Sequence, residues 1–265
     1  MISKTDVVLY RSLVFSIFLL LLFGLPSARG ELGETQGIPK EIRIPILLYH
    51  RFGPVVADSM TVTTPVLESQ LRYLRDNGYS VIRLRELLDL YLGKKQALPY
   101  RSVVITVDDG HRSVYTDLFP LLKKYQFPAT LFLYPSALSN ASYAMTWDQV
   151  REMKETRLLD LQSHTYWHPN FKKEKKRLKP GEYEGFVEMQ LKKSKERIEK
   201  ELNVKVDALA WPFGIYDEEL MSKATAAGYV AAFTMDRRHI MRSDNLMALP
   251  RYLVSNRDQL SRLGL

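Results

Sequence analysis

Apolar residues along this chain fall into short runs that are separated by longer amphipathic segments. From about residue 41 onward, seven runs are continuously apolar or alternate with polar residues, as β-strands do: 44–49, 79–84, 103–107, 130–133, 159–162, 208–211 and 230–234. The intervening segments show helical spacing, which predicts helices at 65–77, 84–92, 117–125, 147–156, 183–202 and 218–227. Such regular alternation of strands and helices indicates a parallel sheet, and seven repeats favour a closed or nearly closed α/β barrel in one domain.

The first 40 residues have a different pattern. Basic residues precede an apolar run at 13–25, and the tripeptide 28–30 offers small residues at a spacing that signal peptidases accept. We interpret residues 1–30 as an export signal or N-terminal anchor, 31–40 as a linker and 41–265 as the folded domain. A membrane span needs about 20 apolar residues, so cleavage is favoured and membrane attachment through an uncleaved N-terminus is the alternative. The protein is therefore expected in the periplasm, outside the cell or on its surface.

Composition narrows these expectations further. The chain has no cysteine, which excludes disulfides and thiolate metal sites. Its formal net charge of +8 would attract anionic polymers or membrane surfaces, but a basic exported protein without a nucleic-acid partner is the simpler interpretation. The one charge run, 172–179, is predicted to be a solvated loop, with substrate binding as the alternative.

Polar residues follow four of the predicted strands directly. They are His50, the pair Asp108 and Asp109, His164 with His168, and the turn Trp211-Pro212-Phe213-Gly214. In a parallel barrel the carboxyl ends of the strands share one rim, so these residues are expected to converge there.

The adjacent carboxylates Asp108 and Asp109 repel each other unless a cation or hydrogen bonds compensate. Neighbouring residues at a strand end point in different directions, which allows one carboxylate to bind a metal while the other faces a reacting water. A plain Asp-Asp-Gly turn is the alternative. His164 and His168 lie four positions apart, as two ligands of one ion require, and with an aspartate they form a set that leaves coordination positions open for catalysis.

The segments TVDDG, SHTYWH and YPSAL together resemble the polysaccharide deacetylases of the nodulation-factor deacetylase homology group, carbohydrate esterase family 4. The resemblance covers roughly residues 41–255, with the strand order of a barrel. It implies a distorted (β/α)7 barrel, a metal held by Asp109, His164 and His168, and Asp108 as the general base. The implied metal is zinc, with iron, cobalt and nickel as alternatives.

The sequence departs from most of this family in two places. The turn that usually contains an arginine bracing the base reads Trp211-Pro212-Phe213-Gly214, and no Leu-x-His motif follows His168 to supply the acid. Arg251 could replace the arginine, but a surface position is the expectation. His111 is expected at the rim without ligating the metal.

An early histidine at the end of the first strand and the Trp-Pro-Phe-Gly turn resemble the biofilm poly-β-1,6-N-acetyl-D-glucosamine deacetylases. There the equivalent of His50 is taken as the acid; the alternative is a hydrogen-bonded core histidine. The resemblance implies a monomeric hydrolase that removes N-acetyl groups from a polysaccharide. Peptidoglycan, chitin oligomers and O-acetylated xylan remain alternative substrates, and a catalytically retired carbohydrate-binding module or a surface adhesin remains an alternative function.

Aromatic residues at the rim are candidates for stacking on sugar rings. They are Trp167, Trp211, Phe213 and Tyr216, with packing in the core as the alternative for each. Tyr134 follows the strand at 130–133, and a backbone N–H near it is expected to stabilise the oxyanion of the reaction.

Overall fold

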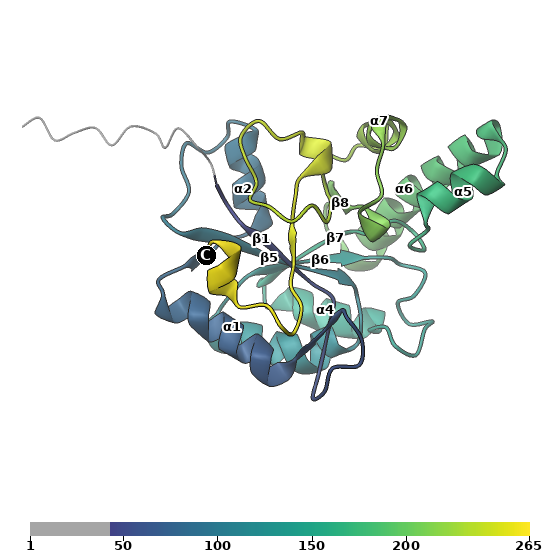
Figure 1. The fold of residues 1–265 in the computed structure, drawn as a ribbon. Coiled ribbons are helices and arrows are strands. Elements are labelled where there is room, and N and C mark those ends of the chain that lie inside the picture. Colours follow the sequence, from purple (N-terminus) through teal and green to yellow (C-terminus); the bar gives the residue numbers. More distant parts are fainter. Residues whose placement is uncertain (1–42) are drawn as a thin grey trace, which may run out of the picture. The chain divides into compact units, whose positions relative to one another are not determined.

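The computed structural model describes residues 43–265, so the predicted signal and linker at 1–40 fall outside the described residues. Parallel strands run in the order β10-β1-β5-β6-β7-β8-β9 and form the centre of the fold (Figure 1). Their bounds are β1 Ile46–Tyr49, β5 Ser102–Asp109, β6 Ala129–Leu133, β7 Leu159–Ser163, β8 Ala208–Ala210, β9 Ala231–Phe233 and β10 Tyr252–Leu253. The short β4 (Ser80–Val81) also pairs with β5, and β2 (Arg51–Gly53) pairs with β3 (Thr61–Thr63) in a separate small sheet.

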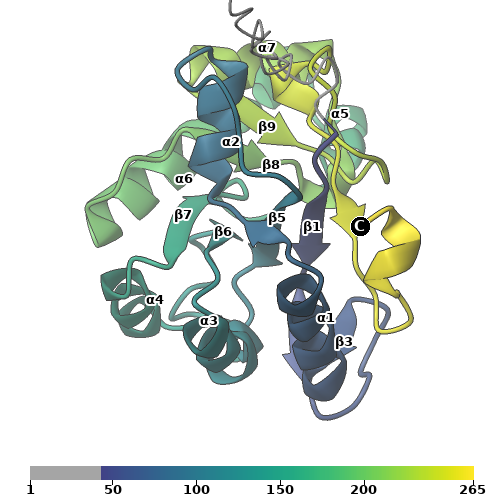
Figure 2. The ribbon, with the colours of Figure 1, turned by 90° about the vertical axis from the view of Figure 1, so that its left-hand side faces the viewer.

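Helices surround these strands, and α1, α3 and α4 lie beside one another below β1, β5 and β6 in Figure 2. The helices are α1 Thr64–Asp76, α2 Leu84–Tyr91, α3 Phe119–Tyr125, α4 Trp147–Glu155, α5 Phe171–Arg177, α6 Pro180–Leu202 and α7 Glu218–Ala226. Local sequence sets several starts: Thr146 and Gln149 form a capping box at α4, and the Asp217 side chain caps α7. No helix among residues 43–265 is long and apolar enough to cross a membrane.

The segment Leu249–Leu253 brings the two edges of the sheet together. The Leu249 N–H donates to the Ala232 carbonyl of β9 at 2.8 Å, whereas Tyr252 and Leu253 pair in register with Leu47 and Leu48 of β1. The sheet is therefore curved and nearly closed, and the predicted distorted (β/α)7 barrel is confirmed.

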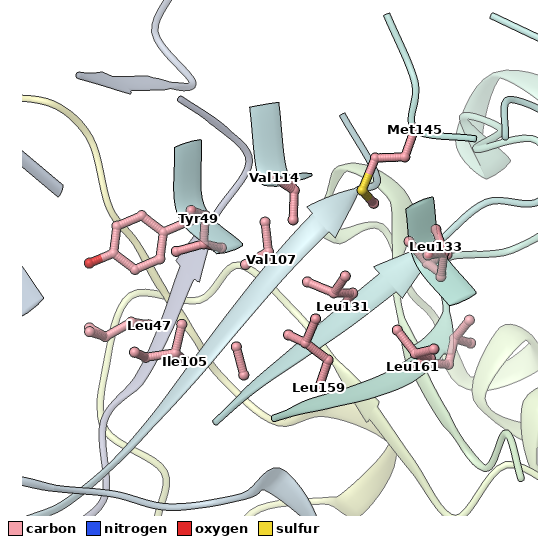
Figure 3. Packing of buried hydrophobic residues seen from close by; sticks show 14 of the residues in the cluster. Leu47, Tyr49, Ile105, Val107, Val114, Leu131, Leu133, Met145, Leu159 and Leu161 are labelled. Atoms are coloured by element: carbon pink, nitrogen blue, oxygen red, sulfur yellow. The ribbon is translucent and has the colours of Figure 1, made fainter. Parts of the chain in front are cut away.

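Side chains of the central strands alternate between two environments, as strand geometry requires. Odd-numbered residues such as Leu47, Ile105 and Leu131 point outward and pack under the helices in one large apolar cluster (Figure 3). Each fully buried leucine contributes roughly 1.5–3 kcal/mol to folding. Even-numbered residues such as Val104 and Phe132 belong to a second apolar cluster. In β1, β5 and β6, odd-numbered residues thus face the helices and even-numbered residues face the barrel interior, whereas β9 has the opposite parity, with Ala231 and Phe233 in the interior cluster.

The predicted loop at 172–179 is wrong, because most of it forms α5. The Asn170 side chain accepts a hydrogen bond from the Lys173 N–H and caps this helix, while Phe171 is fully buried and anchors it. The run of lysines gave no apolar periodicity from which a helix could be predicted. The expectation that the run is solvated still holds for its exposed lysines.

A buried carboxylate stabilises the junction of β7 and β8. Asp207 accepts hydrogen bonds from Arg85 and from Lys205, the latter at 3.0 Å, and its backbone N–H donates to the Gln162 side chain. Burial alone would raise the pKa of Asp207, but these two cations outweigh it and lower the pKa.

We expect Asp207→Asn to lower the free energy of unfolding by about 1–2 kcal/mol at pH 7, less than for a fully buried pair because Arg85 and Lys205 reach solvent. Because the pKa of Asp207 is lower in the folded than in the unfolded protein, its ion pairs stabilise the fold above the unfolded pKa of about 3.9. This stabilisation is lost as the pH falls through the pKa of Asp207 in the folded protein. The difference between the two proteins, measured by urea unfolding, should therefore shrink below about pH 4. An equal difference at all pH values would contradict this account.

Candidate active site

Strand β5 places two adjacent carboxylates at the carboxyl-terminal rim. Asp108 has the parity of the interior residues and is 1% exposed. Asp109 has a φ of 74° and Gly110 a φ of 76°, so the chain turns sharply after the strand. A Cβ atom on Gly110 would lie 3.0 Å from the Leu133 side chain, so glycine avoids both a strained conformation and a close contact there. This turn lets both carboxylates reach the same region while pointing differently.

His164 follows β7 and is held in one orientation. Its backbone N–H donates to the Leu133 carbonyl at 2.7 Å, and its ring Nδ1 lies 2.8 Å from the Ala210 carbonyl oxygen. Because a carbonyl only accepts, Nδ1 carries the proton and Nε2 keeps its lone pair. Burial lowers the pKa of His164 to about 3, so the ring is neutral. A neutral imidazole oriented by a backbone carbonyl is the form in which histidine binds metals.

The three predicted ligands lie together. One donor atom from each of Asp109, His164 and His168 falls within 4.8 Å of the others. Asp109 Oδ1 is 3.6 Å from His164 Nε2 and 3.7 Å from His168 Nε2. These separations exceed a hydrogen bond, so the donors surround a space without bonding one another. Two imidazoles and one carboxylate in this arrangement fit a divalent transition metal with open coordination positions.

The protonation of these groups also favours a cation between them. Burial raises the pKa of Asp109, and the neighbouring Asp108 charge raises it further. Burial lowers the pKa of His168, which leaves its ring neutral. A divalent cation would stabilise the ionised carboxylate and the neutral rings together.

Arg251 pairs with Asp108, contrary to the surface position expected for it. Arg251 is 0% exposed, and its Nη1 and Nη2 donate to the two Asp108 carboxylate oxygens at 2.8 and 2.7 Å. Its Nε donates to the Thr234 carbonyl, and its guanidinium lies near the Phe132 ring. Burial would raise the pKa of Asp108, but Arg251 outweighs it and lowers the pKa to about 2. The expected surface role is therefore wrong, because the barrel-closing segment directs this side chain inward.

His50 lies on the next strand at the level of Asp108. The register pairs Tyr49 with Val107, so the residues after them sit side by side at the rim. His50 is buried, and its Nδ1 has no hydrogen-bond partner among the described residues. Burial lowers the pKa of His50, while Asp108 and Asp109 oppose this effect. The alternative of a hydrogen-bonded core histidine is thus not favoured, since Nδ1 is unpaired.

A pocket of about 500 Å³ opens over this cluster. Of the predicted residues, Asp109, His168, Tyr134 and Phe213 line it, together with His111 at the expected rim position. Two further lining residues were not predicted, Arg51 and Tyr143. The Tyr143 hydroxyl lies 2.6 Å from that of Tyr134, and Arg51 is ion-paired with Asp58 at 2.5 Å. Arg51 directly follows His50, which was the only sequence signal for it.

The aromatic candidates divide into three groups. Phe213 is 56% exposed, and its ring lies 4.5 Å from that of His168, so it presents a surface to a ligand. Trp167 and Tyr216 are exposed but are absent from the pocket lining; Trp167 packs on Phe186 of α6. Trp211 is 0% exposed, and its indole N–H donates to the Met247 carbonyl. The expectation that Trp211 stacks on sugar is wrong, because the ring lies wholly inside the core.

Comparison with known proteins gives a consistent result at the level of the family. Residues 95–232, more than half of the chain, match the family model described as polysaccharide deacetylase. The chain is 27% identical to the poly-β-1,6-N-acetyl-D-glucosamine N-deacetylase of Escherichia coli strain K12 over 90% of its own length, but it spans only 40% of that relative. It is 26% identical to the enzyme of the same name from Staphylococcus aureus strain MRSA252, covering 74% of this chain and 68% of the relative.

Solved structures share the fold. The Streptococcus pyogenes deacetylase PplD, in complex with acetate, superimposes with a TM-score of 0.75 at 24% identity and covers 84% of this chain and 96% of its own. IcaB from Ammonifex degensii gives a TM-score of 0.71 at 25% identity, covering 80% and 92%.

Proposed function

Because this chain belongs to the polysaccharide deacetylase family, we propose that it is a metal-dependent N-deacetylase acting on a polymer of N-acetylglucosamine. One observation carries the proposal: a metal-ligand set of Asp109, His164 and His168 lies beside Asp108, a second carboxylate that pairs with an arginine. A structural metal site would use its ligands fully and would not need a free carboxylate next to them. The arrangement suits hydrolysis, in which a base must act on water beside the metal.

In the proposed mechanism the residues of the chain divide the work. Asp109, His164 and His168 would hold a divalent ion, which would supply Lewis acidity and lower the pKa of a bound water from about 15.7 towards 7. Asp108, which Arg251 keeps ionised, takes the proton of the attacking water. The ring of Tyr134, which lies 5.5 Å from that of His168, forms one wall of the pocket near the developing oxyanion.

His50 is proposed to protonate the departing sugar amine. Burial lowers the pKa of His50, so the ring has to take up a proton from solvent before it can donate that proton to the amine. The two nearby carboxylates favour that protonated form. Base and acid then stand side by side at the ends of neighbouring strands, β5 and β1.

We expect His50→Gln to lower kcat for N-acetyl sugars by about 100-fold, because an amine is a poor leaving group until it is protonated. An aryl acetate has a leaving group that needs no proton, so its hydrolysis should fall much less. Both rates are measured as acetate release. A structural role for His50 would instead reduce both substrates equally, and that result would remove the acid assignment.

The polymer we propose is poly-β-1,6-N-acetyl-D-glucosamine. Support comes from His50 at the end of β1, from the Trp-Pro-Phe-Gly turn that presents Phe213 to the pocket, and from the relatives, which are poly-β-1,6-N-acetyl-D-glucosamine N-deacetylases. We also propose that residues 1–30 direct export, so that the domain at 41–265 meets its polymer outside the cytoplasm. The segment would either be cleaved or be retained as a membrane anchor.

The experiment is acetate release by the purified protein from β-1,6-linked and β-1,4-linked N-acetylglucosamine oligomers, peptidoglycan and acetylxylan. We expect turnover on the first substrate, loss after chelation, and recovery with zinc, cobalt, nickel or iron. Activity on peptidoglycan or acetylxylan alone would move the protein to another substrate. Binding of the oligomers without acetate release from any substrate, with metal present, would instead indicate a binding module.

A further inference from the structure

The loop that carries His168 has a costly backbone conformation. Thr165 has a φ of 64° and His168 a φ of 59°, both in the left-handed region that residues with side chains rarely adopt. Such conformations cost of order 1–3 kcal/mol each and persist only when surrounding contacts enforce them. Within the loop, the His168 N–H donates to the Thr165 hydroxyl at a long 3.2 Å. From the barrel side, the Thr165 N–H donates to Ser163 Oγ at 3.2 Å and the Ser136 N–H donates to the Tyr166 carbonyl at 3.1 Å, but neither bond reaches residue 167 or 168.

Helix α6 supplies constraints from outside the loop. Phe186, Gln190 and Lys193 are spaced four and three residues apart and so share one helix face. The Phe186 ring lies 5.6 Å from that of Trp167, and the Lys193 ammonium lies 4.3 Å from the centre of the Tyr166 ring. Both side chains therefore contact the segment immediately before His168, and Gln190 lies between them on the same face.

Gln190 makes the most specific of these contacts. Its Oε1 accepts a hydrogen bond from the Trp167 backbone N–H at 3.0 Å, and its side chain is 0% exposed. The peptide N–H of Trp167 thus finds its partner 23 residues away, on another element. Loss of the acceptor would remove the hydrogen-bond partner of this N–H, which favours rearrangement of the loop. The helix itself is fixed to the barrel, because Ser194 Oγ lies 2.8 Å from Ser163 Oγ on β7.

We propose that α6, chiefly through Gln190, is a positioning element that holds His168 in its metal-binding conformation. Gln190 does not touch the metal or the substrate; it fixes the peptide next to a ligand. The inference rests on the proposed metal centre and goes beyond it, because it assigns a long helix outside the active-site rim to metal affinity. Figure 1 shows α5 and α6 extending together away from the strands, so only the part of α6 near this loop is needed for that role.

The test is the dissociation constant for zinc, measured on metal-free protein by competition with a chromogenic chelator. Gln190→Met keeps the length of the side chain and removes the acceptor. We expect this variant to bind zinc about tenfold more weakly, as is typical when a supporting partner of a ligand is removed. Phe186→Ala, at a partly buried position on the same face, should raise the constant in the same direction. Phe186→Ala also tests the role of α6 if Gln190→Met does not fold.

Gln70→Met is the matched control. Gln70 is also a buried helical glutamine, and its Oε1 accepts from the Tyr49 hydroxyl at 3.1 Å, away from the His168 loop. The Gln70→Met variant should have lower thermal stability than the wild type but the same zinc affinity. Unchanged zinc binding by the α6 variants, or equal weakening by Gln70→Met, would overturn the positioning role while leaving the metal centre intact. A wild-type chain that binds no divalent ion would overturn the metal centre, and this inference with it.

Discussion

Asp108→Asn is expected to lower kcat for deacetylation by about 10³–10⁴-fold while zinc binding is largely retained. The substitution removes the Asp108 carboxylate, which is not one of the proposed metal ligands. In the wild type this carboxylate is paired with Arg251. Loss of a positioned general base costs up to about 10⁴-fold in rate. The measurements are acetate release under saturating substrate and zinc affinity by chelator competition.

The adjacent residue provides the control for this prediction. Asp109→Asn changes the same chemical group one position along β5, but it removes the charge of a proposed ligand. It should therefore weaken zinc binding strongly, and added zinc should restore part of its activity. Added zinc should not rescue Asp108→Asn. If both variants lost zinc to the same extent, the division between base and ligand would be wrong.

Arg251→Met should lower the free energy of unfolding of the metal-free protein by about 3–5 kcal/mol at pH 7, because it leaves a buried carboxylate without its partner. In the wild type, Arg251 outweighs burial and lowers the pKa of Asp108 to about 2. Stability from this pair is thus present above the unfolded pKa of about 3.9 and lost as the pH falls towards 2. Without the arginine, burial raises the pKa of Asp108 instead. The loss of unfolding free energy caused by Arg251→Met should therefore be largest near neutral pH and smaller below about pH 4.

Arg238→Met is the matched control for charge and hydrogen-bond geometry. Arg238 also binds a carboxylate through both Nη atoms, at 2.9 and 2.8 Å from Asp244, but its side chain is 45% exposed. Because Arg238 stays in contact with solvent, although the Asp244 side chain is only 8% exposed, we expect this pair to contribute about 1 kcal/mol. Urea unfolding of both variants at pH 7 and pH 4 separates the two cases. Equal small losses would mean that Asp108 is compensated by something other than Arg251.

The barrel and the metal-ligand candidates could be predicted because their signals are local. The alternating run into Asp108 and Asp109 identifies a strand that ends in two acids, and the spacing of His164 and His168 identifies a pair of ligands. Their convergence then follows from a general property of parallel barrels, that strand ends share one rim. The roles of these residues remain predictions, although the structure brings their side chains together.

Arg251 could not be placed from sequence because its partner lies 143 residues away. Nothing near it marks a strand, since β10 has only two residues. The prediction for Trp211 was wrong for a related reason, because a residue at the end of a strand can face either the rim or the core. Packing against Phe171 holds the Trp211 ring in the core. Both errors concern the direction of a side chain, which depends on tertiary contacts more than on local pattern.

The closure of the barrel by Leu249–Leu253 makes the proposed catalytic centre dependent on the last strand of the chain. A ribosome has completed the metal ligands long before it adds Arg251, so a growing chain carries the ligands without the counter-charge of the base. Only docking of the final strand joins Arg251 to Asp108 and completes the pair. A chain that ended upstream of this strand would consequently contain the three ligands and Asp108 but lack the arginine that keeps this base ionised.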